Sequence, residues 1–383
     1  MIILLVSAVT FLFSKETICL NMIVRNESDV ILRSLRSVVD LIDYWVIVDT
    51  GSTDDTMKKI RKFLQGIPGE LHEKPWRNFG ENRSEAFELA KGKASYILFM
   101  DADDVLSFSG ERTFGALTHD CYNFWRGTEE FSYIKPQIVK SSLPWKWIGV
   151  THEYIDCGFP YTSAVLQDPR YITKSGGACS KHPTKKFFRN IMLLESDLKK
   201  DPHNPRSMFY LAESYRDAGK PADALVCYQK RIAMGGWQEE VFWSYLQIGL
   251  LLEKLGLSKA VVERAYLDAH EYRKKRIEPV YFLAKLRNRF EEYAESYSLI
   301  KRYLQQSKSS KDILFNMDWI SDYGLLFEYS IAAYYIGKYE QSKNLSLSLL
   351  QLPHLPNEWK KFVMDNLAFA AKQLEQTASR SRQ

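Results

Sequence analysis

The sequence has few cysteines and no strong excess of charge. Its five cysteines are scattered, at Cys19, Cys121, Cys157, Cys179 and Cys227. No two of them have the CxxC spacing of a zinc site, and such an odd, dispersed set predicts free thiols in a reducing, cytoplasmic compartment. The net charge is only +5, from 52 basic and 47 acidic residues. A nucleic-acid partner is therefore not expected.

Long apolar runs are scarce as well. The run at the N-terminus, Ile2 to Phe13, spans twelve residues, whereas a membrane-spanning helix needs about 20. No Lys or Arg precedes the run and no small-x-small site follows it, so a cleaved signal peptide fits poorly. Two other interpretations stay open for residues 1–16: a membrane-associating segment, which would allow peripheral membrane contact, and an additional buried strand.

Strand-like and helix-like segments do alternate through the first half of the chain. Such β-α-β order predicts an α/β, Rossmann-like domain with a mostly parallel sheet. In these sheets, ligands bind beyond the carboxyl ends of the strands. The expected strands are Thr17–Val24, Tyr44–Thr50, Glu70–Trp76 and the run ending at Met100, and the expected helices are Ser28–Ile42, Ser52–Gly66 and Asn78–Gly92.

The second half has a helical pattern with an internal repeat. The segment 205–236 matches a tetratricopeptide (TPR) unit, with small and bulky residues at the packing positions and a turn at Gly219. Looser copies have turns at Gly256 and Gly337, and helical repeats are binding surfaces that also allow homo-oligomers. The expected parts are an apolar segment (1–16), the α/β domain (17–186), an all-α TPR-like domain (187–375) and a disordered tail (376–383).

Three acidic residues crowd the end of the apolar run Ile97–Met100. In an extended segment Asp101 and Asp103 point to the same side, and two carboxylates that face one point suit Mg²⁺ or Mn²⁺. Asp104 follows directly. The alternative is an acidic loop that caps the next helix.

Other polar residues follow the neighbouring strands. Asp49 ends a strand and would accept a hydrogen bond from a nucleobase or ribose, although it also fits an N-capped turn. Arg25 and Glu27 follow the first strand. Arg83 suits a diphosphate because guanidinium matches phosphate geometry, but an ion pair with a glutamate of its own helix would also explain it.

Taken in order, "CLNMIVRNESDVILRSLRSV", "VIVDTGSTDDT" and "NFGENRSEAFELAKGKASYILFMDADD" resemble the nucleotide-binding half of a family-2, GT-A-type glycosyltransferase. The later "WKWIGVTHEYI" and the TPR-like region resemble the subgroup that fuses this domain to helical repeats. The resemblance implies inverting transfer of a hexosyl or N-acetylhexosaminyl group from a nucleoside-diphosphate sugar. It also implies a protein, peptide or glycan acceptor and a divalent cation, Mn²⁺ or Mg²⁺.

The resemblance assigns roles to individual residues. Asp49 would contact the nucleobase, Asp101 the ribose or the metal, and Asp103 the metal. His152, in "GVTHEYI", would be the downstream ligand that completes the metal site.

Inverting transfer also needs a general base that deprotonates the acceptor. Glu153 is the preferred candidate and Asp104 the alternative. Many family members place the base in an acidic pair ahead of a helix, and the only nearby pair here is Glu129-Glu130. The base assignment therefore departs from the family pattern.

Two alternative functions remain open. One is a TPR-type scaffold whose first domain is inactive, with partner binding as its task. The other is a haloacid-dehalogenase-type phosphatase, in which Asp101 of "ILFMDADDVL" would be the nucleophile. That second class needs a later Lys and a further acidic pair at strand ends, and the sequence offers no convincing set.

Overall fold

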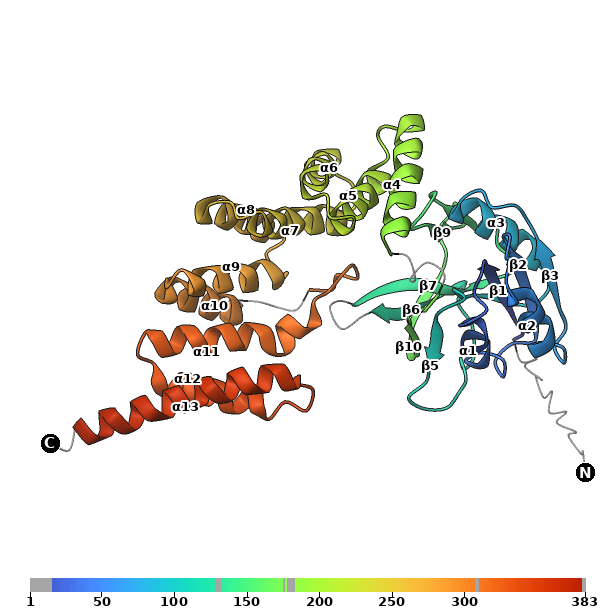
Figure 1. Ribbon diagram of the computed structural model, residues 1–383. Helices are drawn as coiled ribbons and strands as arrows, with labels where there is room; N and C mark the ends of the chain where they lie inside the picture. The colour runs from blue at the N-terminus through green and yellow to red at the C-terminus, as the bar shows by residue number, and fades with distance from the viewer. Residues whose placement is uncertain (1–15, 128–131, 175, 178–182, 307–309, 381–383) are drawn as a thin grey trace, which may run out of the picture. The chain divides into compact units, whose positions relative to one another are not determined.

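The computed structural model describes residues 16–127, 132–174, 176–177, 183–306 and 310–380, which form two compact units (Figure 1). The described residues up to Arg126 and from Ile134 to Gly177 form the first unit. The second consists of those from Pro183 onward together with Gly127, Ser132 and Tyr133. The apolar run of residues 2–13 lies outside the described residues.

The first unit is built on an eight-stranded sheet with the strand order β3-β2-β1-β4-β7-β6-β10-β5. Strands β3, β2, β1 and β4 are mutually parallel, whereas β7 pairs antiparallel with β4 and β5 antiparallel with β10. The predicted α/β, Rossmann-like fold is thus confirmed. The strands are β1 (Ile18–Val24), β2 (Tyr44–Asp49), β3 (Gly69–Glu73), β4 (Tyr96–Phe99), β5 (Val105–Ser107), β6 (Cys121–Gly127), β7 (Ser132–Lys140) and β10 (Ser163–Ile172).

Both faces of this sheet are covered, because alternate residues of a strand point to opposite sides. On one face Leu20 and Ile47 pack with the residues of α1 (Ile31–Arg36) and α2 (Thr56–Phe63). On the other face Val46 and Ile97 pack with α3 (Phe79–Ala90) and with a small two-stranded sheet. That sheet consists of β8 (Lys146–Ile148) and β9 (Tyr154–Asp156).

The first two helices are shorter than predicted. Helix α1 begins at Ile31 rather than Ser28, and the backbone N–H of Ser28 donates to Asp54 Oδ2 at 3.1 Å. It ends at Arg36, where the Ser37 hydroxyl donates to the carbonyl of Ser34 at 2.7 Å. Such local hydrogen bonds compete with the helix ladder.

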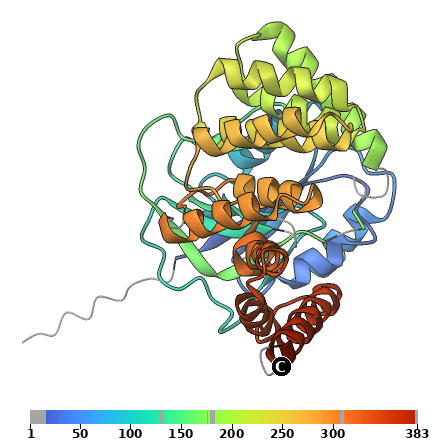
Figure 2. The same cartoon turned by 90° about the vertical axis from the view of Figure 1, so that its left-hand side faces the viewer.

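The second unit is a row of helices in which each packs mainly on its neighbours in sequence (Figures 1 and 2). This nearest-neighbour packing is typical of TPR-like repeats. No helix in the described part of the chain is long and apolar enough to cross a membrane. The helices are α4 (Pro183–Lys200), α5 (Pro205–Asp217), α6 (Pro221–Met234), α7 (Gln238–Lys254), α8 (Lys259–Tyr272), α9 (Glu278–Arg289), α10 (Tyr293–Gln306), η1 (Ile320–Gly324), α11 (Leu325–Tyr335), α12 (Tyr339–Leu350) and α13 (Asn357–Arg380).

The turns explain why one repeat is hard to find from sequence. Gly219, Gly256 and Gly337 have φ values of +73°, +71° and +78° between paired helices, as the sequence predicts. Between α9 and α10 the same left-handed position is occupied by Glu291, with φ +61°. A search for glycine turns therefore misses this pair. Helix α13 continues to Arg380, which corrects the prediction that the tail is disordered from residue 376.

Candidate functional site

The carboxyl ends of β1, β2 and β4 meet at one edge of the sheet, where Asp49 ends β2 opposite Val24. Asp49 is 1% exposed, and its Oδ1 accepts from the backbone N–H groups of Gly51 at 2.8 Å and Ser52 at 2.7 Å. Its Oδ2 is buried without a hydrogen-bond partner among the described residues. Leaving a buried acceptor unpaired costs about 1–3 kcal/mol, so this oxygen is a candidate acceptor for a ligand's N–H or O–H.

The loops after β1 and β2 are tied together at this edge. Asn26 has a left-handed φ of +56°. Its side-chain Oδ1 accepts from the backbone N–H of Thr53 at 2.7 Å, and its own N–H donates to Ser52 Oγ at 2.9 Å. Arg25 and Glu27 flank it; the first is exposed and the second half-buried.

Asp101 lies between two guanidinium groups. Its Oδ1 accepts a hydrogen bond from Arg83 Nη2, and its Oδ2 is 3.4 Å from Arg126 Nη2. Burial alone would raise the pKa of Asp101, but Arg83 and Arg126 outweigh it and hold that pKa well below its ordinary value. The backbone N–H of Asp101 donates to the Tyr171 hydroxyl at 2.8 Å. Arg83 therefore pairs with the strand-end acid, not with a glutamate of its own helix.

Asp104 is more deeply buried than Asp101. It is 1% exposed, and its Oδ2 accepts from Arg126 Nη2 at 2.7 Å. The guanidinium of Arg126 lies over the ring of Tyr171, 4.0 Å from the centroid. Burial, with the negative charge of Asp101, raises the pKa of Asp104 to about 7. Asp104 is therefore poised to hold a proton near neutral pH.

Glu153 reaches the same cluster from the loop between β8 and β9. Its Oε1 forms an ion pair with Arg83 Nε at 2.7 Å, and its side chain is 6% exposed. Burial opposes ionisation, but Arg83 and Lys135 lower the pKa of Glu153 and keep the carboxylate charged. The preceding His152 has a left-handed φ of +50° and is exposed.

Close packing against α3 holds this loop in place. A Cβ at Gly80 would overlap the carbonyl oxygen of Gly149, so only glycine lets the helix approach the loop. The backbone N–H of Phe79 donates to the carbonyl of Val150 at 3.1 Å. Helix α3 thus carries Arg83 and also positions the loop that carries Glu153.

Lys135 on β7 adds a third cation to the cluster. Its Nζ lies 5.5 Å from the ring centroid of Trp147, and the guanidinium of Arg83 lies 5.2 Å from the same centroid. Burial lowers the pKa of Lys135 to about 8, while Glu153 acts in the opposite direction. The three cations of this cluster thus lie near three carboxylates. The cations belong to Arg83, Arg126 and Lys135, and the carboxylates to Asp101, Asp104 and Glu153.

Asp101, Asp103 and His152 are the predicted metal ligands. Among the described residues, no three His, Cys, Asp and Glu side chains are arranged to hold a metal ion. Both carboxylate oxygens of Asp101 face arginines, His152 is exposed, and a Cβ at Gly177 would overlap the Asp103 carboxylate. Both oxygens of Asp101 thus have arginine partners, and the roles of Asp103 and His152 as metal ligands remain predictions.

Sequence reasoning missed Arg126, Lys135 and Tyr171. All three lie on strands β6, β7 and β10 of the antiparallel half of the sheet. Arg126 follows Phe124 by two residues, and Phe124 is fully buried. Residues two apart in a strand share a face. A charged residue on the same strand face as a core aromatic was therefore the signal that could have identified Arg126.

The two engaged oxygens of Asp101 also bear on the phosphatase hypothesis. A nucleophilic aspartate needs an oxygen that is free to attack. Here Arg83 and Arg126 occupy both, so the geometry offers no support for that function.

Comparisons with known proteins agree with the predicted family. Residues 19–111 match the family model Glycosyl transferase family 2. The glycosyltransferase SunS from the SPbeta prophage of Bacillus subtilis is 26% identical over 231 residues, which are 56% of this chain and 53% of SunS. An uncharacterized glycosyltransferase of Rickettsia felis is 33% identical over 92 residues, 24% of this chain and 30% of the relative.

The resemblance of the N-terminal domain to family-2 glycosyltransferases is thus confirmed, although the chain spans only about half the length of SunS, 53%. Among solved structures, YrrB, a TPR protein with an unusual peptide-binding site, is 11% identical. The match covers 50% of this chain and 86% of YrrB with a TM-score of 0.34. That score is too low to carry an argument, so the repeat assignment depends on the helix pairs themselves.

Proposed function

We propose that the N-terminal domain transfers a sugar, with inversion, from a nucleoside-diphosphate sugar to a polypeptide or glycan acceptor. One observation carries the proposal. In the segment that matches the family model, Asp49 ends β2 and Asp101 follows β4 by two residues, and Arg83 lies with Asp101 at the same edge.

The donor would lie across this edge of the sheet. The unpartnered Oδ2 of Asp49 would accept from the nucleobase or ribose. The cations of the cluster would stabilise the negative charge that develops on the diphosphate as the sugar leaves, and such electrostatic stabilisation often contributes more to catalysis than any other effect. Arg25 and Glu27 would line the same rim.

A divalent cation, Mn²⁺ or Mg²⁺, is expected from the family resemblance, with Asp103 as its first candidate ligand. The described side chains do not form its site by themselves. We therefore assign no step to the cation.

Glu153 is our candidate for the general base. Arg83 and Lys135 keep its carboxylate ionised, which is the form that accepts a proton from an acceptor hydroxyl or thiol. Asp104 is the weaker candidate because it is 1% exposed, against 6% for Glu153, so an acceptor reaches it less easily. The helical repeats would bind the acceptor or a partner.

Incubation of the purified protein with a panel of nucleotide sugars, with and without Mn²⁺, tests the proposal. We expect one donor to bind and to be turned over. Asp103→Ala should abolish metal-dependent turnover with an unchanged fold, while the exposed Asp223→Ala in α6 serves as the matched control. Unchanged turnover in Asp103→Ala would remove Asp103 from the site. If no donor binds, the scaffold function is favoured.

A further inference from the structure

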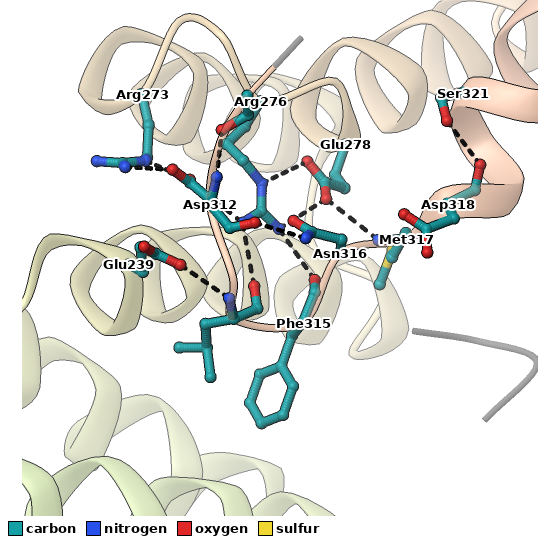
Figure 3. Close-up of polar contacts among 12 residues, drawn as sticks. Glu239, Arg273, Arg276, Glu278, Asp312, Phe315, Asn316, Met317, Asp318 and Ser321 are labelled. Carbon is teal, nitrogen blue, oxygen red and sulfur yellow. Dashed lines mark hydrogen bonds and ion pairs between the residues drawn. The ribbon is translucent and has the colours of Figure 1, made fainter. Parts of the chain in front are cut away.

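The chain between α10 and η1 is held by side chains of the neighbouring helices (Figure 3). Residues 310–317, which we call the strap, contain no helix. The residues that hold the strap come from α5, α7, the end of α8 and the turn before α9, and Tyr133 of β7 packs on Phe315 with ring centroids 5.9 Å apart. All of them belong to the second unit.

Glu239 and Arg276 form hydrogen bonds with the backbone of the strap. The N–H groups of Ile313 and Leu314 both donate to Glu239 Oε2, at 2.8 Å each. The carbonyls of Leu314 and Phe315 accept from Arg276 at 3.1 and 2.9 Å. These contacts do not depend on the identity of the strap's side chains.

Two side chains of the strap are also recognised. The carboxylate of Asp312 is bound by Arg273 through two hydrogen bonds (Figure 3). Phe315 has a left-handed φ of +48°, and its ring packs 4.9 Å from that of Trp243 and 6.4 Å from that of Phe209. An acidic residue and an aromatic residue three positions later therefore provide the anchors.

The residues that bind the strap, which we call the clamp, include an ion pair that does not involve the strap. Arg276 is 2% exposed and forms two hydrogen bonds with Glu278, at 2.9 and 2.7 Å. Its guanidinium would keep this partner if the strap left. Leaving would thus not create an unpaired buried charge, which would be strongly destabilising.

We propose that this clamp is a peptide-binding site of the helical unit and that the strap occupies it as an intramolecular ligand. The partner is a peptide with an acidic residue three positions before an aromatic residue that adopts a left-handed φ. Every group that the clamp recognises can be supplied by a separate chain, because backbone amides and carbonyls, one carboxylate and one ring suffice. This inference does not depend on the glycosyltransferase activity.

Because the strap is tethered to the clamp, its effective concentration determines how strongly it competes with a free peptide. A short linker gives a bound segment an effective concentration of about 1 mM. If the free peptide binds the open clamp with a Kd of about 10 µM, the strap weakens its apparent affinity by roughly 100-fold.

Fluorescence anisotropy with a labelled synthetic peptide of residues 310–318 tests the proposal on the full-length protein. We expect the double variant Asp312→Ala/Phe315→Ala to bind this peptide on the order of 100-fold more tightly than the wild type. Adding Glu239→Ala to the double variant should reduce the gain, because it removes the oxygen that accepts from two backbone N–H groups of the strap. A control peptide with alanine at both anchor positions should not bind.

Three results would overturn the proposal. The first is a double variant with unchanged circular dichroism that binds no better than the wild type. The second is a wild type that binds as tightly as the variant. The third is loss of helical structure both in the double variant and in the milder Asp312→Asn, which would make the strap a structural part of the unit.

Discussion

Replacing Arg83 by methionine tests whether this guanidinium neutralises the half-buried Asp101 and the buried Glu153 at the sheet edge. Its side chain is 11% exposed and contacts both Asp101 and Glu153. Methionine keeps much of the aliphatic length but has no charge. Arg126 stays 3.4 Å from Asp101, so Glu153 loses its closest counter-charge while Asp101 keeps one.

Removing one partner of a buried ion pair costs about 3–5 kcal/mol. Because Arg126 compensates in part, we expect the lower end, about 3 kcal/mol at pH 8. The pKa values of Asp101 and Glu153 are lowered from 3.8 and 4.5 in the wild type. Their pairing therefore stabilises the fold above those ordinary values and is lost only as the pH falls below them.

In the Arg83→Met variant the same two pKa values rise, and the acids take up protons in the folded state as the pH falls. The stability difference between wild type and variant should therefore shrink from pH 8 to pH 5.

Hydrogen exchange of the β4 amides measures this effect in the first unit alone, which avoids the two-unit unfolding of the whole chain. A loss of about 3 kcal/mol corresponds to a protection factor about 150-fold lower. Arg77→Met is the control, since Arg77 lies 3.8 Å from Glu81 with both side chains more than half exposed. It should cost under about 0.5 kcal/mol. Equal protection in Arg83→Met and Arg77→Met, or a difference independent of pH, would refute the reasoning.

Three further predictions concern the same site. Gly80→Ala should lower kcat by about tenfold or more, because its Cβ overlaps the Gly149 carbonyl and moves the loop of Glu153; Gly66→Ala, which meets nothing, should be neutral in the same assay. Glu153→Gln should lower kcat by about 10²–10⁴ with little change in donor affinity by calorimetry, since glutamine accepts no proton; equal activity would exclude Glu153 as the base. The pKa of Asp104 rises from 3.8 to about 7 on folding, so the folded state holds an extra proton and stability falls as the pH rises through that window. Asp104→Asn should flatten this fall in β4 amide protection, and an unchanged slope would contradict it.

The sequence indicated which acids lie at the edge of the sheet. Asp49 and Asp101 were predicted from their place after apolar strands, and parallel pairing does bring those strand ends to one edge. Their counter-charges were predicted less well, because a metal ion was expected where Arg83 and Arg126 face Asp101. Arg126 comes from an antiparallel strand whose position in the sheet cannot be deduced from local pattern.

The sequence by itself determined the order of strands and helices, the acidic strand ends and the helical repeats with glycine turns. These features arise from local patterns of apolar, charged and glycine residues. Such patterns act through interactions between residues that are close together in the sequence. The tertiary structure decided which charges meet. It set Glu153 beside Arg83, gave Asp104 its buried place, and laid the strap across α7 and the turn before α9. Those contacts join residues far apart in the chain, and their strength depends on burial, which no local pattern specifies.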